Sequence, residues 1–425
     1  MERILLCLAH MSGKEQHFIK EAFDQNWVVP LGPNVDGFEK DLEVFVNRRE
    51  NAEPMHKKVV ALSAGTAAVH LALIGCGVRH GDEVLVQSFT FCASSHPVTY
   101  LGATPIFIDS EKDTWNMAPE LLEEAIKDRF AKTGKKPKAI IPVALYGMPY
   151  KIDRIMEIAD SYGIPVIEDA AEGFGSRFKG QVLGTFGRYG VLSFNGNKMI
   201  TTSGGGALIC PDADKAREIL WYATQARESY PYYQHEAIGF NYRMSNICAG
   251  IGRGQMTIAD EHIAHHRHVQ ALYEELLNDV EGITMHVNPE ADFDSNYWLC
   301  TATIDRDVRI KGQEKAYRQL VSGAVGGAAG VTHAASTAMT DCQPNDNVEA
   351  LRMALDAANI ESRPLWKPMH KQPVYRNNPS YINGISESLF KTGICLPSGP
   401  WVTDEHIRYI VKTDTVSLSV SKKGY

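Results

Sequence analysis

The sequence contains no paired cysteine motif, no excess of basic residues and no long hydrophobic run. Its eight cysteines are scattered singly, so zinc or dithiol redox chemistry is not indicated, and free thiols in a reducing cytoplasm are the simplest interpretation. Lysine and arginine number 43 against 51 aspartates and glutamates, a net charge of −8, which provides no basic field for nucleic acid. We therefore expect a cytoplasmic protein that does not bind nucleic acid.

Two stretches of low charge are poor candidates for membrane segments. Residues 4–9 are apolar but too few for the core of a signal peptide. Residues 321–340 carry no acidic residue, lysine or arginine, yet they consist mainly of Gly, Ala, Ser and Thr and are too polar for a membrane span. We expect no membrane association, and we interpret 321–340 as an irregular insertion.

Short β-branched runs alternate with helical patterns in the first half of the chain. This alternation predicts an α/β fold, a mainly parallel mixed sheet sandwiched by helices. The expected strands are residues 58–62, 83–87, 105–109, 139–144, 165–168, 191–194 and 206–209, and the expected helices are 67–74, 119–126, 152–162 and 212–227.

The rest of the chain predicts a smaller α+β domain. We expect residues 1–250 to form an N-terminal segment and a large domain, 251–278 a linking helix, and 279–425 a small C-terminal domain that contains the insertion. The linking helix belongs to a long helical pattern at 246–277. Within the small domain we expect a strand at 297–304 and helices at 348–359 and from 404 onward.

Lys198 and Asp169 are the most informative residues. Lys198 follows strand residues and precedes the glycine triplet 204–206, which lets the chain turn close to a bound group. Asp169 follows an expected strand and would face the crevice at the sheet's carboxyl edge. A lysine that forms a Schiff base and an aspartate that keeps a pyridinium protonated are what pyridoxal 5'-phosphate needs. The alternatives are a solvated loop lysine and an aspartate that caps a helix.

The turn at Gly65, Thr66 and Ala67 is a candidate phosphate site. Gly65 lets the backbone approach an anion, Thr66 offers a hydroxyl, and the start of a helix supplies free amides. Ser193 offers a second hydroxyl beside Lys198. The alternative is an ordinary helix start, which Ser, Thr and Gly often form.

Two further side chains are placed beside these groups. Glu172 could approach the phenolic oxygen of the cofactor or a neighbouring amide. Phe91 could stack on the cofactor ring, although most aromatics at strand ends belong to the core.

Six ordered segments resemble the DegT/StrS family of sugar-nucleotide aminotransferases, which have the aspartate-aminotransferase fold, pyridoxal phosphate fold type I. The segments are residues 26–33, 63–66, 168–171, 193–206, 239–244 and 363–370.

The resemblance implies roles for these residues. Lys198 would form the Schiff base, Asp169 would hold the pyridine nitrogen, and Glu172 would approach the phenolic oxygen, while Gly65, Thr66 and Ser193 would bind phosphate. The active sites would be shared within a homodimer, so that Asn241 would reach the cofactor phosphate of the neighbouring chain.

The resemblance also implies a reaction. The enzyme would move an amino group from glutamate to a nucleotide-linked keto sugar for surface polysaccharide or glycan biosynthesis. Local variants resemble members that act on UDP-4-keto-6-deoxy-N-acetylhexosamine, the bacillosamine type. The alternatives are another keto sugar, of perosamine or 3-keto type, and a cofactor-binding regulator without turnover.

Trp366, Lys367 and His370 are candidate substrate contacts. The cation suits a diphosphate, and the ring suits a base or a sugar face. Their alternative is packing within the small domain, where Pro364 and Pro368 fix the backbone.

One competing motif is His262 and His266, four residues apart on an expected helix. This spacing can bind a metal ion. Because no third ligand is evident and Arg267 adds positive charge, a solvated helix face is favoured, and we expect no metal.

Overall fold

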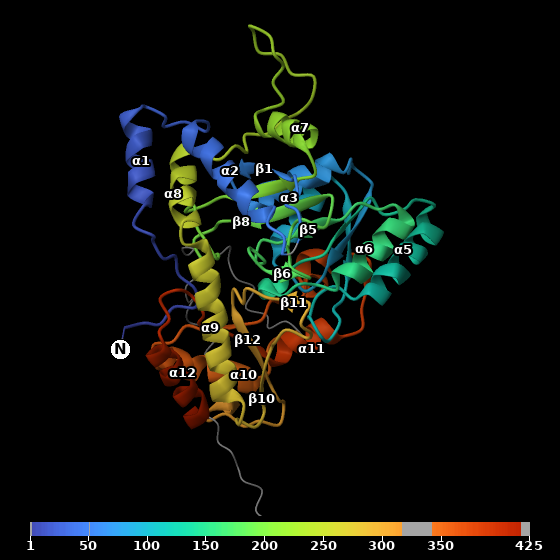
Figure 1. The fold of residues 1–425 in the computed structure, drawn as a ribbon. Coiled ribbons are helices and arrows are strands. Elements are labelled where there is room, and N and C mark those ends of the chain that lie inside the picture. The colour runs from blue at the N-terminus through green and yellow to red at the C-terminus, as the bar shows by residue number, and fades with distance from the viewer. Residues whose placement is uncertain (1, 51, 317–341, 418–425) are drawn as a thin grey trace, which may run out of the picture.

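The computed structural model describes residues 2–50, 52–316 and 342–417 (Figure 1). The expected insertion at 321–340 lies outside the described residues. The helices are α1 (Glu15–Asp24), α2 (Pro33–Val46), α3 (Gly65–Gly75), α4 (His96–Tyr100), α5 (Pro119–Thr133), α6 (Ile152–Tyr162), α7 (Ala213–Ala223), α8 (Asn246–Met256), α9 (Ala259–Leu277), α10 (Asp346–Ala357), α11 (Ile385–Thr392) and α12 (Asp404–Ser417).

One large mixed sheet forms the centre of the molecule. In one half of the sheet all strands are parallel, whereas the other half begins with a parallel pair and ends in two antiparallel pairs. Two isolated parallel bridges, Ile140 to Val166 and Val143 to Asp169, connect the halves. The resulting strand order is β14 (Ser380–Tyr381), β3 (Thr104–Ile108), β2 (Glu83–Gln87), β4 (Ala139–Ile141), β5 (Ile167–Asp169), β8 (Tyr189–Ser193), β9 (Gly206–Cys210) and β1 (Lys58–Leu62).

Helices cover both faces of this sheet. In β2, Leu85 points into a core shared with α2, α5 and α6, whereas Val84 and Val86 point into a second core shared with α3, α4 and α7. Because side chains alternate along a strand, burial on both faces explains why the strands are almost continuously apolar. The predicted α/β sandwich is confirmed, and the predicted bounds of β1, β2 and α6 match the observed ones.

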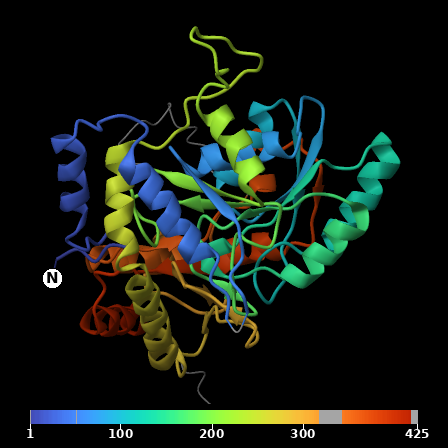
Figure 2. The same cartoon turned by 45° about the horizontal axis from the view of Figure 1, so that its top comes forward.

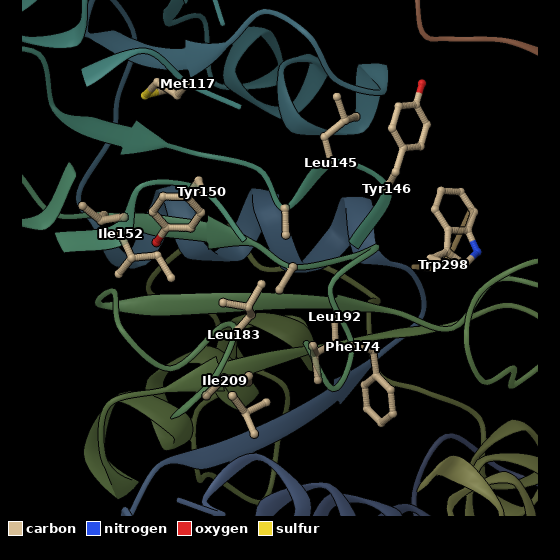
Figure 3. Close-up of a cluster of buried hydrophobic side chains, with 14 of the residues drawn as sticks. Met117, Leu145, Tyr146, Tyr150, Ile152, Phe174, Leu183, Leu192, Ile209 and Trp298 are labelled. Atoms are coloured by element: carbon tan, nitrogen blue, oxygen red, sulfur yellow. The ribbon is translucent and has the colours of Figure 1, made fainter. Parts of the chain in front are cut away.

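The first of these cores continues to the edge where the polar residues gather. Figure 3 shows Leu192 and Ile209 of the central strands packed with Phe174 and Leu183, while Tyr146 and Trp298 lie at one end of the cluster. These two aromatic side chains come from outside the central strands, and Trp298 also lines the cavity described below.

A second sheet belongs to the C-terminal part of the chain. Its order is β10 (Ile283–Met285), β12 (Cys300–Ile304), β15 (Gly393–Leu396) and β13 (Arg363–Pro364), and β11 (Phe293–Asp294), β6 (Arg177–Phe178) and β7 (Gln181–Val182) form a small third sheet. Helix α9 runs from the large sheet down to this region and packs on α12 and β10 (Figure 1). The predicted domain boundaries at 250 and 279 stay a prediction.

Other predicted bounds differ from the observed ones, most clearly in three elements. The helical pattern at 246–277 divides into α8 and α9, with a break at Thr257 and Ile258. Helix α7 ends at Ala223 rather than at residue 227, because Gln225 and Ala226 have positive φ angles of 64° and 50°. The strand expected from 297 begins at Cys300, since Tyr297 also has a positive φ, 48°.

Candidate active site

A cavity of about 300 Å³ lies where β1, β5 and β8 end. This is the edge at which open α/β sheets bind ligands, and its size lies at the lower end for small-molecule sites. Its lining includes Ser63, Ala64, Gly65, Thr66, Thr90, Phe91, Ser94, Asp169, Glu172, Ser193, Asn195, Asn197, Lys198, Trp298 and Trp366.

Lys198 is the cation of this cavity. Its side chain is 14% exposed, and its Nζ atom lies 3.4 Å from Oε1 of Glu172 and 3.9 Å from the ring centroid of Trp298. The backbone N–H of Lys198 donates to the carbonyl of Asn195 at 2.9 Å, which closes a tight turn after β8. The alternative of a solvated loop lysine is therefore wrong.

Glu172 joins Lys198 to the wall of the cavity. Its Oε2 accepts a hydrogen bond from the backbone N–H of Tyr146 at 2.7 Å, and Tyr146 holds a positive φ of 55°. Burial raises the pKa of the Glu172 carboxyl, and the positive charge of Lys198 opposes that rise. The buried carboxyl of Glu172 and the largely buried amine of Lys198 thus lie within ion-pair distance of each other.

Asp169 ends β5 and points into the same cavity. Ser94 Oγ donates to its Oδ2 at 2.6 Å, and the backbone N–H of Ala171 donates to its Oδ1 at 3.1 Å. The helix-cap alternative is wrong, because α7 is the next helix and begins only at Ala213. Burial raises the pKa of Asp169, with Ser94 as the main opposing influence. A bound cation would stabilise this carboxylate.

The predicted phosphate turn lies at the start of α3. Among the described residues no side chain caps this helix at Ala64, so its first amides remain available to an anion beside Thr66 and Ser193. A Cβ atom on Gly65 would lie 3.0 Å from Cβ of Ser193, which shows how closely the two segments approach. Ala67 is buried behind the turn and does not line the cavity.

Phe91 and Trp366 form an aromatic wall. Phe91 is 49% exposed, so its alternative as a core residue is wrong, and its ring centroid lies 5.2 Å from that of Trp366. The indole N–H of Trp366 is buried without a hydrogen-bond partner among the described residues, so it could serve a bound acceptor.

The other two candidate substrate residues lie outside this lining. His370 Nδ1 pairs with Ser88 Oγ at 2.7 Å, and burial lowers the pKa of His370. The backbone carbonyl of Lys367 accepts from the side chain of Gln372 at 3.3 Å, so this segment packs against itself.

Asn241 also lies away from the cavity of its own chain. It is exposed and forms an isolated bridge with Thr224 at the base of the long loop between α7 and α8. This loop projects from the body of the molecule in both views (Figures 1 and 2). Such a position is compatible with a contact to another chain.

Two of the four histidines of α9, His262 and His266, are buried, and the prediction of a solvated helix face is wrong for them. His262 Nδ1 donates to the carbonyl of Met199 at 3.1 Å, and His266 Nδ1 donates to the carbonyl of Tyr297 at 3.1 Å. Burial lowers the pKa of His266 to about 3, which keeps it neutral. Within residues 2–50, 52–316 and 342–417, no three His, Cys, Asp or Glu side chains are grouped for a metal ion.

Sequence reasoning missed three residues of the site. Ser94 lies three residues after Phe91, and its hydroxyl donates to Asp169. A hydroxyl so close to a candidate ring contact was the available signal. Tyr146 and Trp298 had no local signal, because their contacts to Glu172 and Lys198 come from distant parts of the chain.

The lining fits pyridoxal 5'-phosphate. A buried carboxylate with a raised pKa needs a cation such as a pyridinium, and an uncapped helix start flanked by two hydroxyls suits a phosphate. Lys198 supplies the amine, and Phe91 borders the space between them.

Comparisons with known proteins agree with this fit. The model of the DegT/DnrJ/EryC1/StrS aminotransferase family matches residues 10–329 and 317–414. The chain is 42% identical to EpsN of Bacillus subtilis (strain 168), named as a pyridoxal phosphate-dependent aminotransferase, over 95% of this chain and 93% of that protein. It is 34% identical to a GDP-perosamine synthase of Escherichia coli O157:H7 over 95% of each.

A solved structure is similar over nearly the whole chain. It is a DegT DnrJ EryC1 StrS aminotransferase from Brucella abortus, with a TM-score of 0.79, 26% identity and 96% of each chain covered. None of the helices in the described residues combines the length and apolar character that crossing a membrane requires.

Proposed function

The chain belongs to the DegT/DnrJ/EryC1/StrS aminotransferase family, and from this membership we propose that it transfers the amino group of glutamate to UDP-4-keto-6-deoxy-N-acetylhexosamine for surface polysaccharide or glycan biosynthesis. The family makes it a pyridoxal phosphate-dependent aminotransferase. One observation carries the proposal, namely that Lys198, Glu172 and Asp169 meet in one cavity beside an uncapped helix start.

Each residue of the site has a proposed task. When bound, the cofactor supplies an aldehyde that condenses with amines and a ring that accepts the electrons of a carbanion. Asp169 would hold a proton on the ring nitrogen, and the amides of α3 with Thr66 and Ser193 would bind the phosphate. Phe91 would cover one ring face.

Lys198 would move the protons. Its Nζ would take the α-proton of glutamate and would later deliver a proton to the sugar carbon that carried the keto group. Glu172 lies 3.4 Å from this amine and would orient it between the two positions. Because Glu172 is buried and the side chain of Lys198 is only 14% exposed, these transfers would be shielded from bulk water.

The substrate would enter along the aromatic wall. The unpaired indole N–H of Trp366 suits an oxygen of the sugar, and Lys367 suits the diphosphate. His370 would support the same segment through Ser88.

A homodimer would complete the site. Asn241 is exposed on a projecting loop and would bind the cofactor phosphate of the partner chain. Each chain would then depend on the other for full activity.

The test is a two-stage assay. In the first stage, purified protein should show an absorbance band of bound cofactor that bleaches with glutamate. In the second stage, added UDP-4-keto-6-deoxy-N-acetylglucosamine should restore the band, and the mass of the sugar should change from that of the ketone to that of the amine. Proton couplings of the product would give its stereochemistry. Lys198→Ala should lose turnover, whereas Lys14→Ala, an exposed control, should retain it. Full turnover in Lys198→Ala would refute the mechanism.

A GDP-linked keto sugar is the second candidate. It is favoured by the 34% identity to a GDP-perosamine synthase over 95% of each protein. Supplying UDP- and GDP-linked 4-keto sugars in parallel distinguishes the two by which one restores the band. A cofactor that never changes form with any donor or keto sugar would instead support a regulator without turnover.

A further inference from the structure

Lys198 has a second partner besides Glu172. The ring of Trp298 lies under its amine, with Nζ 3.9 Å from the ring centroid. An aromatic face attracts an ammonium group but has no comparable attraction for a neutral amine, and tryptophan is the strongest of the aromatic residues in this respect. The ring face therefore suits a positive charge on Nζ at this position.

Trp298 is held rigidly in this position. Its side chain is buried, and its indole Nε1–H donates to the carbonyl of Asn197 at 2.6 Å, so it grips the residue that precedes the lysine. Its backbone N–H donates to Oδ1 of Asn296 at 2.8 Å, and its carbonyl accepts from Ser398 Oγ at 2.7 Å.

Helix α9 fixes both sides of this contact. His266 donates to the carbonyl of Tyr297, which has a positive φ of 48° directly before Trp298. One turn earlier, His262 donates to the carbonyl of Met199, directly after Lys198. A non-glycine residue at positive φ costs free energy and persists only where its surroundings hold it. The contact between Trp298 and Lys198 is thus imposed from outside the cavity.

We propose that Trp298 is a positioning residue that holds the free amine of Lys198 over its ring and stabilises the ammonium that forms when this amine accepts a proton. The inference rests on the proposed function and adds a residue to it. When the α-C–H bond of the amino donor breaks, its electron pair stays with the donor carbon and the proton forms a new N–H bond on Lys198. The cation formed in that step lies over the indole ring.

Among the described residues, three titratable side chains besides the ring of Trp298 lie close enough to interact with the charge of Lys198. Glu172 and Asp169 are the carboxyl groups that face Lys198, and the thiol of Cys7 is the third titratable neighbour. Burial raises the pKa of Cys7 to about 12, so the thiol stays neutral. The two carboxyl groups remain in every Trp298 variant, which isolates the contribution of the ring.

Pulse acetylation followed by peptide mass spectrometry tests the proposal. The full chain loaded with pyridoxamine 5'-phosphate, in which Lys198 is not bound to the cofactor, is labelled with acetic anhydride from about pH 7 to about pH 11, the range around the ordinary lysine value. We expect the pH of half-maximal labelling at Lys198 to fall by about 0.5 to 1 unit in Trp298→Leu and by less in Trp298→Phe, which keeps a weaker ring. A change in how easily acetic anhydride reaches Lys198 would alter the labelling rate by the same factor at every pH. A loss of charge stabilisation would instead move the pH of half-maximal labelling.

Controls separate this inference from the proposed function. Trp221→Leu, on α7 and outside the cavity, should leave the midpoint unchanged, and the labelling is repeated without cofactor. The half-reaction with glutamate should slow about three- to tenfold in Trp298→Leu. If Trp298→Leu does not fold, the smaller shift in Trp298→Phe decides. An unchanged midpoint in both variants overturns the inference, while a wild-type band that ignores glutamate overturns only the proposed function.

Discussion

Asp169 and Glu172 are both buried at the edge of the cavity, and burial raises the pKa of each. Their stabilising partners are few, because Asp169 has Ser94 and Ala171 whereas Glu172 has Tyr146 and Lys198. Burying a carboxylate without a matching cation costs free energy, so Asp169 destabilises the cofactor-free fold. A bound pyridinium would provide the charge that Asp169 lacks.

Asp169→Asn should therefore stabilise the cofactor-free protein and damage the enzyme. The folded state raises the pKa of Asp169, so it holds the proton more tightly than the unfolded state, and stability from this group falls as pH rises above about 4. We expect a gain of about 1 kcal/mol at neutral pH that disappears near pH 4. Turnover should fall at least about a hundredfold. Thermal unfolding measured at several pH values checks the stability, and steady-state rates check the turnover.

The matched control is Asp160→Asn, an exposed aspartate near the end of α6, which should change neither quantity. Equal unfolding temperatures of wild type and Asp169→Asn at every pH would show that burial does not strain this carboxyl group.

At the level of elements, the phosphate turn depends on one member of the glycine triplet. Gly206 pairs with Leu62 in the register between β1 and β9, and a Cβ atom on it would collide with the backbone N of Gly65. Gly204 lies two residues earlier, where a Cβ atom would meet nothing within 4 Å. The triplet therefore contains a packed glycine and an open one.

Gly206→Ala should displace the start of α3 and weaken cofactor binding. Because the obstacle is backbone rather than a flexible side chain, we expect a stability loss of about 2 kcal/mol or more and a cofactor Kd at least about tenfold higher. Gly204 lines the cavity, so the control is Gly196→Ala, outside the lining, where a Cβ atom would meet only the carbonyl oxygen of Ser203 at 4.0 Å; this variant should bind the cofactor as wild type does. Equilibrium titration followed by absorbance measures the Kd, and equal values for the two variants would contradict the proposed geometry of the turn.

The elements that sequence reasoning placed well are those with strong local periodicity. Strands β1 and β2 and helix α6 carry their own apolar patterns, and the polar residues that follow strands, such as Asp169, were correctly placed at the sheet edge. His262 and His266 were misjudged because their partners are carbonyls at Met199 and Tyr297, and no local pattern reports such distant acceptors. Trp298 was missed for the same reason.

For the whole molecule, the projecting loop between α7 and α8 has an unusual surface. Tyr230, Tyr232, Tyr233 and Ile238 are exposed on it, and the last of these is 86% exposed. Clustered exposed apolar side chains mark contact surfaces. Asn241 lies at the base of the same loop, which is the arrangement expected if the loop packs on a second copy of the chain.

Mixing inactive variants tests whether the sites are shared. Lys198→Ala removes the amine within a chain, whereas Asn241→Asp would place a negative charge beside the partner's phosphate. In a mixed dimer one site would carry both changes and the other neither, so activity should recover to about a quarter of the wild-type value after random exchange of subunits. Mixing Lys198→Ala with Asp169→Asn, both in the cavity of one chain, should recover nothing, because each site then keeps one defect. Recovery in that control, or none in the first mixture, would show that Asn241 does not serve the neighbouring site.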